Sequence, residues 1–188
     1  QAELQSSALE CSPSFGRGFT SPSKSVRLEQ MLDEKIVLEV ITGSHAYGLN
    51  HAASDIDKMG IFVAKTVKVA GLDWHAKSES WSDAGPTGDD SSYHEIGKYL
   101  QLVLGSNPTL IELMFMDDYL VLDDIGQGII DLRGDILHSR GVKSAYVGYS
   151  YSQLKRVFED GPREFKPKMA RHTLRIARQG LELLETGS

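Results

Sequence analysis

The chain has 188 residues, of which 40% are hydrophobic and 24% are charged, and this composition is typical of a globular chain with its own hydrophobic core. Its formal net charge of −6 excludes a general electrostatic attraction to nucleic acid or to an anionic membrane. A phosphate-bearing partner therefore has to be held by a local basic patch or by a metal ion.

The first 25 residues are rich in Ser, Gly and Pro and follow no regular period, which predicts a flexible arm or a long loop. They contain the only cysteine, Cys11, so the chain has neither an internal disulfide nor a thiolate zinc site. The start lacks the basic and apolar regions of a secretory signal, and no apolar run approaches the roughly 20 residues that span a bilayer. We therefore expect a cytoplasmic protein.

The next part of the chain has the pattern of strands. Residues 34–42 form a short, β-branched and nearly all apolar run, which predicts a buried strand. Residues 54–65 predict a second strand, and residues 65–72 extend or follow it as an edge element. A polar stretch over 73–90 predicts a loop, with a short strand around residues 78–82.

After Asp90 the hydrophobic period becomes helical. Ser92 and Glu95 have the spacing of a capping box, and Gly105 suits the end of that helix. Asn107 is placed as the N-cap of the next helix, with Pro108 in its first turn. Further helices are predicted at roughly 124–137, 142–159 and 167–185. The pattern indicates a small α/β front half and a helical back half.

Two aspartates and a preceding turn carry the chemistry. Asp55 and Asp57 are placed in one predicted strand, so alternation puts them on one face, about 6.5–7 Å apart. Such like charges repel, whereas carboxylates so spaced suit Mg²⁺. The Gly43-Ser44 turn lets the backbone approach a phosphate closely. An Asp-x-Asp pair alone is common, so the prediction depends on the order strand, Gly-Ser turn, strand, Asp-x-Asp.

The segment "GSHAYGLNHAASDID" resembles the signature of the DNA polymerase β-type nucleotidyltransferase superfamily: Gly-Ser, ten residues, then Asp-x-Asp. The blocks "NPTLIELMF" and "HTLRIARQGLELLETG" are similar to a bacterial and phage branch of predicted nucleotidyltransferases, the RNA-repair-pathway polymerase β-like proteins. The resemblance covers roughly residues 36–187. It implies an α/β (α+β) fold with a small mixed sheet, divided into an arm (1–25), a nucleotidyltransferase core (26–123) and a helical region that completes the cleft (124–188).

The resemblance implies an enzyme that moves an NMP from an NTP to an acceptor hydroxyl and releases pyrophosphate, with two Mg²⁺ or Mn²⁺ ions. It assigns catalytic and metal-binding roles to Asp55 and Asp57 and to a third carboxylate on a later strand. For that third position we favour Asp90, at a predicted strand-to-helix junction, and then Asp89. The alternative reading of Asp90 is a charge that stabilises a helix N-terminus.

Nucleotide binding is predicted for the turn and for basic residues of the back half. Lys168, His172 and Arg175 recur at i, i+4 and i+7, on one helix face. The alternative reading of His45 is an exposed turn histidine, and that of the basic residues of the back half is a solvated helix face. The predicted nucleotide-binding residues are Gly43, Ser44, His45, Lys155, Lys168, His172 and Arg175.

Two other functions compete with the nucleotidyltransferase. One is a catalytically silent nucleotide- or RNA-binding protein of the same fold. The other is a phosphatase whose site begins with Asp-x-Asp, but that motif continues to a Thr where this chain has Met59. The acceptor stays open among an RNA end, a protein hydroxyl and a small molecule, and no membrane partner is expected.

Overall fold

The computed structural model describes residues 34–52, 54–71, 80–84, 90–159 and 167–187. The chain divides into two units, Gln1–Asp33 and Glu34–Ser188, and the described residues all belong to the second. The predicted N-terminal arm, residues 1–25, and Asp89 lie outside the described residues. Of the helices in the described part of the chain, none is both long and apolar enough to cross a membrane.

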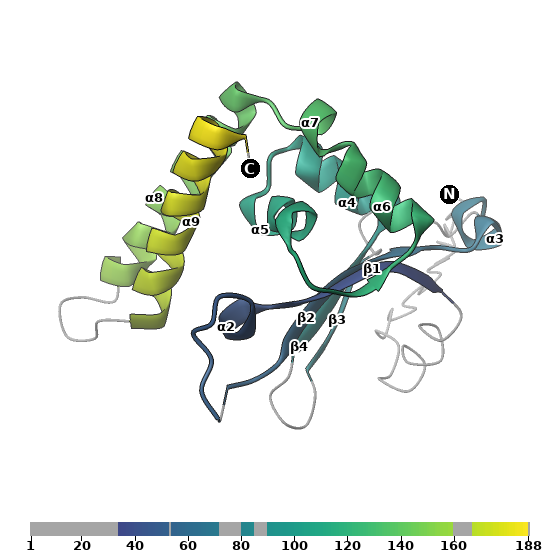
Figure 1. Ribbon diagram of the computed structural model, residues 1–188, viewed down its shortest axis with the longest axis horizontal. Helices are drawn as coiled ribbons and strands as arrows, with labels where there is room; N and C mark the ends of the chain where they lie inside the picture. The colour runs from purple at the N-terminus through teal and green to yellow at the C-terminus, as the bar shows by residue number, and fades with distance from the viewer. Residues whose placement is uncertain (1–33, 53, 72–79, 85–89, 160–166, 188) are drawn as a thin grey trace, which may run out of the picture. The chain divides into compact units, whose positions relative to one another are not determined.

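A five-stranded mixed sheet forms the front half (Figure 1). Its order is β3-β4-β2-β1-β5, and β2 and β4 run parallel while the other neighbours are antiparallel. This arrangement, with helices following in the chain, confirms the predicted α+β class. The strands are β1 (Lys35–Thr42), β2 (Asp57–Val63), β3 (Ser80–Ala84), β4 (Asp90–Glu95) and β5 (Tyr119–Leu122).

Helices connect the strands and make up the back half. Figure 1 shows α8 and α9 side by side, and they form the longest helical unit of the described residues. The elements are α2 (Gly43–Ala46), α3 (Thr66–Val69), α4 (Ile96–Leu104), α5 (Pro108–Ile111), the 3₁₀ helix η1 (Glu112–Phe115), α6 (Asp124–Asp131), α7 (Arg133–Ile136), α8 (Ser139–Glu159) and α9 (Pro167–Thr186).

The main core lies between the sheet and these helices. Leu38 and Ile61 of the sheet, Tyr99 of α4 and Ile176 of α9 are fully buried in one cluster. The Tyr99 hydroxyl donates to the Leu110 carbonyl at 3.1 Å, so the one polar atom at the end of this ring has a partner. Apolar burial at about 25 cal/mol per Å² is the main force that holds α9 against the front half.

Several predicted elements are confirmed. The buried strand is β1, and a helical turn, α2, follows it. Asn107 caps α5, since its side chain accepts from the Thr109 N–H at 3.1 Å and Pro108 occupies the first position. The three C-terminal helical segments occur as α6 with α7, α8 and α9.

Other expectations are wrong. β2 begins at Asp57, so Asp55 precedes the strand rather than lying in it. Residues 66–69 form helix α3 instead of an edge element. Asp90 opens strand β4 rather than a helix, and Glu95 is the N-cap of α4, where it accepts from two backbone N–H groups. The capping box at Ser92 therefore does not form, because residues 90–95 pair with both β2 and β3.

Candidate functional site

Two carboxylates meet where parallel strands begin. β2 and β4 pair with Lys58 opposite Ser91, which places Asp57 and Asp90 side by side on one face of the sheet. The Asp90 backbone N–H donates a hydrogen bond to the Asp57 carboxylate. Asp90 is thus positioned by strand pairing at the start of β4, and its role as a third carboxylate stays a prediction.

The groups around Asp57 shift its pKa in opposite directions. Burial raises the pKa of Asp57, and the carboxylates of Asp90 and Asp55 raise it further, because each disfavours a second negative charge nearby. The Lys168 ammonium and the Asp90 N–H lower that pKa. Asp55, Asp90 and Lys168 therefore all lie within electrostatic reach of Asp57, although Lys168 comes from α9, far along the chain.

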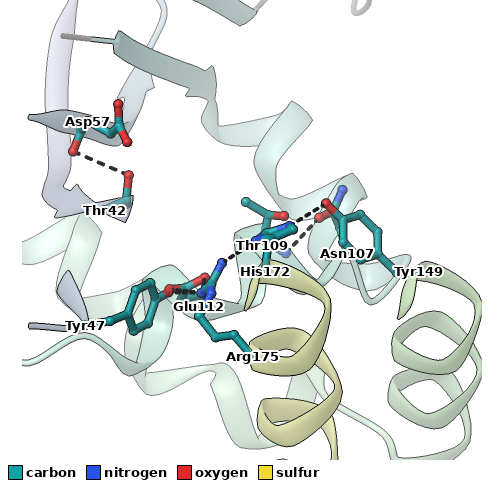
Figure 2. A network of polar contacts seen from close by, with 9 residues as sticks. All are labelled: Thr42, Tyr47, Asp57, Asn107, Thr109, Glu112, Tyr149, His172 and Arg175. Carbon is teal, nitrogen blue, oxygen red and sulfur yellow. Dashed lines mark hydrogen bonds and ion pairs between the residues drawn. The ribbon is translucent and has the colours of Figure 1, made fainter. Parts of the chain in front are cut away.

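The glycine of the Gly-Ser turn touches this carboxylate. Gly43 has φ +68°, a conformation that side chains with a Cβ rarely adopt, and a Cβ placed there would lie 2.3 Å from Asp57 Oδ2. In Figure 2, Thr42 lies beside Asp57, and its hydroxyl donates to the Asp57 carbonyl at 3.4 Å. Glycine is thus required here both by the backbone angle and by the packing of the carboxylate.

The remaining turn residues organise the segment that leads to the aspartates. Ser44 lies in the four-residue helix α2, and its carbonyl accepts from the Leu49 N–H at 2.9 Å. His45 Nε2 lies 3.4 Å from the Ser54 carbonyl, one residue before Asp55. Lys155 lies exposed on α8.

A second polar cluster surrounds Arg175 of α9 (Figure 2). Its Nη1 lies 2.9 Å from both carboxylate oxygens of Glu112, and the guanidinium stacks 4.1 Å from the centre of the Tyr47 ring. Nη1 also donates to the Tyr47 hydroxyl. The Arg175 guanidinium thus joins α9 to η1 and to the residue that follows α2.

His172 continues this cluster to α8. Arg175 Nη2 lies 3.1 Å from His172 Nδ1, and since Arg only donates, Nδ1 accepts and the ring proton sits on Nε2. Nε2 lies 3.2 Å from the Tyr149 hydroxyl. Burial lowers the pKa of His172, and the neighbouring Arg175 lowers it further, which favours this neutral form.

Glu112 was not predicted as a site residue. It is 9% exposed, and burial raises the pKa of its carboxyl while Arg175 and Gln179 lower it. The pair joins residues 63 positions apart, a separation at which no local sequence pattern operates. The only local signal was the apolar run around Glu112, in which a carboxylate needs a partner.

Two cavities border these clusters. One, of about 660 Å³, is lined by Tyr47 and Glu112 together with residues of α9 such as Gln179. The other, of about 380 Å³, is lined by Met59, Ser92 and Tyr149 among others. The polar cluster around Arg175 therefore has one end at each cavity.

The carboxylates offer the oxygen donors that Mg²⁺ prefers. Within the described ranges, no three His, Cys, Asp or Glu side chains form a ligand cluster. Mg²⁺ usually binds one or two carboxylates and takes its other ligands from substrate phosphates and water, so a full protein cluster is not required. A cation bound beside Asp57 would offset the negative charges of Asp90 and Asp55 that raise its pKa.

Comparison with known protein families identifies the family of the chain. The model of the RNA repair pathway DNA polymerase beta family matches residues 22–188, most of the chain. No curated protein matches the chain.

Proposed function

Because the chain belongs to the RNA repair pathway DNA polymerase beta family, we propose that it is a metal-dependent nucleotidyltransferase. It would move an NMP from an NTP to an acceptor hydroxyl and release pyrophosphate. The observation that carries this proposal is the placement of Asp57 beside Asp90 at the start of two paired strands, with Gly43 packed against the Asp57 carboxylate. Such a group of like charges costs stability and is favoured only where a cationic ligand compensates it.

Asp57 and Asp90 would hold Mg²⁺ or Mn²⁺, with Asp55 as a further oxygen ligand, and two ions are expected. The metal, when bound, polarises the phosphoryl oxygens and stabilises the charge that develops during transfer. Asp90, which is exposed, would accept the proton of the acceptor hydroxyl.

The phosphates would be held by the turn and by α9. Gly43 packs against the Asp57 carboxylate, and the backbone N–H groups of Gly43 and Ser44, at the start of α2, would bind the phosphates there. Lys168 is the basic residue that acts on Asp57, so we assign it to the triphosphate. His45 and Lys155 stay predicted nucleotide contacts.

His172 and Arg175 were predicted to bind the nucleotide directly. Arg175 is paired with Glu112, and His172 lies between Arg175 and Tyr149. This pairing favours a role for both in holding α9, and with it Lys168, against the turn. Their contribution to the nucleotide would then be indirect.

The test uses the purified chain with each α-labelled NTP, Mg²⁺ or Mn²⁺, and a mixture of RNA, protein and small-molecule acceptors. Asp57→Asn is the inactive variant, and Asp135→Asn, an exposed aspartate of α7, is its matched control. Transfer by the native chain and Asp135→Asn, but not by Asp57→Asn, is the expected result. Metal-dependent NTP binding without transfer to any acceptor would instead indicate a silent nucleotide-binding protein.

A further inference from the structure

The larger of the two cavities has an acidic wall. Its volume of about 660 Å³ is that of a site for a small organic ligand, and its lining comes from β1, α2, β5, η1, α8 and α9 among others. Carboxylates reach it from three parts of the chain. They are Glu112 of η1, Asp117 and Asp118 just before β5, and Glu182 of α9.

Most of this negative charge is not neutralised by the protein. Glu112 is paired with Arg175, as Figure 2 shows. The described residues include no ion-pair partner for the other three carboxylates, Asp117, Asp118 and Glu182. Among the described residues that line the cavity, none is Lys or Arg, and one, His45, is a histidine. The cavity therefore repels phosphates and attracts cations.

The spacing of the carboxylates does not suit a single metal ion. In the described part of the chain, no three His, Cys, Asp or Glu side chains lie close enough together to hold one ion. An ammonium or guanidinium group has several N–H donors, and a chain that carries more than one such group can reach carboxylates on separate elements. The separation of the acidic residues thus favours an extended organic cation.

Apolar side chains lie between the charged groups. Leu120, which is 50% exposed, lines the cavity together with Met116 and Leu183. The hydrocarbon stem of an ammonium or guanidinium compound packs against such side chains while its charged end stays with the carboxylates. The wall therefore fits both parts of an alkyl cation.

Aromatic rings favour the same class of ligand. Tyr47 and Phe115 line the cavity, and each stacks against a guanidinium of the protein, at 4.1 Å for Arg175 and 5.2 Å for Arg133. Neither guanidinium lines the cavity itself. Because the face of an aromatic ring attracts cations, these rings add to the attraction of the carboxylates.

We propose that this cavity binds an organic cation with an alkyl stem. The cation comes either from a free polyamine or from a Lys or Arg side chain of a polypeptide, which share this chemistry. The proposal does not use the transfer reaction, so its test and that of the proposed function are independent. Glu112 and Tyr47 belong both to the cavity and to the cluster around Arg175, so a bound cation also acts on the residues that hold α9.

Equilibrium dialysis of labelled spermidine against the full chain measures the site. Asp118→Asn/Glu182→Gln removes two charges from the cavity, whereas the control Asp135→Asn/Glu185→Gln removes two exposed charges of α7 and α9 that do not line it. We expect the cavity variant to weaken binding about tenfold and the control to weaken it less than about twofold. Equal weakening would indicate attraction to the total negative charge and would overturn the proposal.

A cation tethered in the cavity gives a second test. Leu120→Arg places a guanidinium at the cavity from an exposed position, and Leu122→Arg is the matched change on the same strand, outside the lining. Leu120→Arg should block spermidine binding and have the higher Tm of the two, because its guanidinium meets carboxylates. Spermidine binding that Leu120→Arg leaves unchanged would overturn the site, whether or not the carboxylate variant folds.

Competing ligands identify the source of the cation. The probes are unlabelled spermidine and two peptides with blocked ends, Gly-Lys-Gly and Gly-Arg-Gly, with MgCl₂ as the inorganic control. Tighter binding of spermidine supports a free polyamine, and tighter binding of a peptide supports a side chain of a polypeptide. Displacement by MgCl₂ as effective as that by spermidine would overturn the proposal, as would the absence of binding by all three organic probes.

Discussion

Replacing Arg175 with Ala removes the positively charged partner of Glu112, a carboxylate buried in the protein core. The side chain of Glu112 is 8% exposed and that of Arg175 is 21% exposed, so neither group regains full hydration when its partner is lost. Breaking a buried pair from one side costs about 3–5 kcal/mol. At roughly 2–4 °C per kcal/mol for a chain of this size, Arg175→Ala should lower Tm by about 6–20 °C.

The loss should depend on pH. Burial raises the pKa of Glu112 while Arg175 lowers it, so the pKa rises further in Arg175→Ala. The folded variant then binds a proton more tightly than the unfolded chain, and its stability is lost as pH rises through the folded pKa. The free-energy gap between native chain and variant should be smaller at pH 5 than at pH 8, as measured by urea unfolding.

Arg178→Ala is the control, because Arg178 is an exposed residue of the same helix and should change stability by less than about 0.5 kcal/mol. A loss below about 1 kcal/mol in Arg175→Ala would refute the argument from burial. Equal losses at pH 5 and pH 8 would refute the argument from the Glu112 charge.

Three further predictions concern the site and its support. Asp57→Asn removes a carboxylate whose pKa is raised by burial and by Asp90 and Asp55. Because the charged form of Asp57 is disfavoured in the folded protein, the variant should raise the Tm of the metal-free protein at pH 8 and not near pH 4. The same variant should abolish transfer. Gly43→Ala should cost about 1–3 kcal/mol and weaken NTP binding, whereas Gly128→Ala in α6, with open space around it, should not destabilise. The pKa of His172 is lowered in the folded protein, so on acidification the unfolded chain protonates this histidine at a higher pH than the folded chain does. The stability of the native chain should therefore fall as pH drops below 6.5. Urea unfolding of His172→Gln should show a smaller fall.

The elements that could be predicted from the sequence are those whose local residue pattern alone favours the structure they adopt. The β-branched run of β1 and the Asn107-Pro108 start of α5 each combine propensity with a terminal signal that needs no distant partner. The Gly43 turn was predicted to face the strand that carries the aspartates, and the antiparallel pairing of β1 with β2 places Thr42, the residue before Gly43, opposite Asp57.

The errors arise where pairing overrides local preference. The Ser92–Glu95 spacing satisfies a capping box, but residues 90–95 lie between β2 and β3, where backbone hydrogen bonds on both sides favour a strand. β5 was missed because it has four residues, of which two are exposed. The Glu112–Arg175 pair and the approach of Lys168 to Asp57 depend on how α9 packs, which the sequence of α9 alone does not contain.

The polar cluster on α9 has a consequence for ligands that never touch each other. Tyr47 lines one cavity and Tyr149 lines the other, and Arg175 and His172 join the two tyrosines through hydrogen bonds. A ligand that breaks the hydrogen bond between Tyr149 and His172 therefore changes the interaction of Arg175 with Tyr47. By thermodynamic linkage the effect is mutual: the factor by which one cavity's ligand changes affinity at the other is the same in both directions.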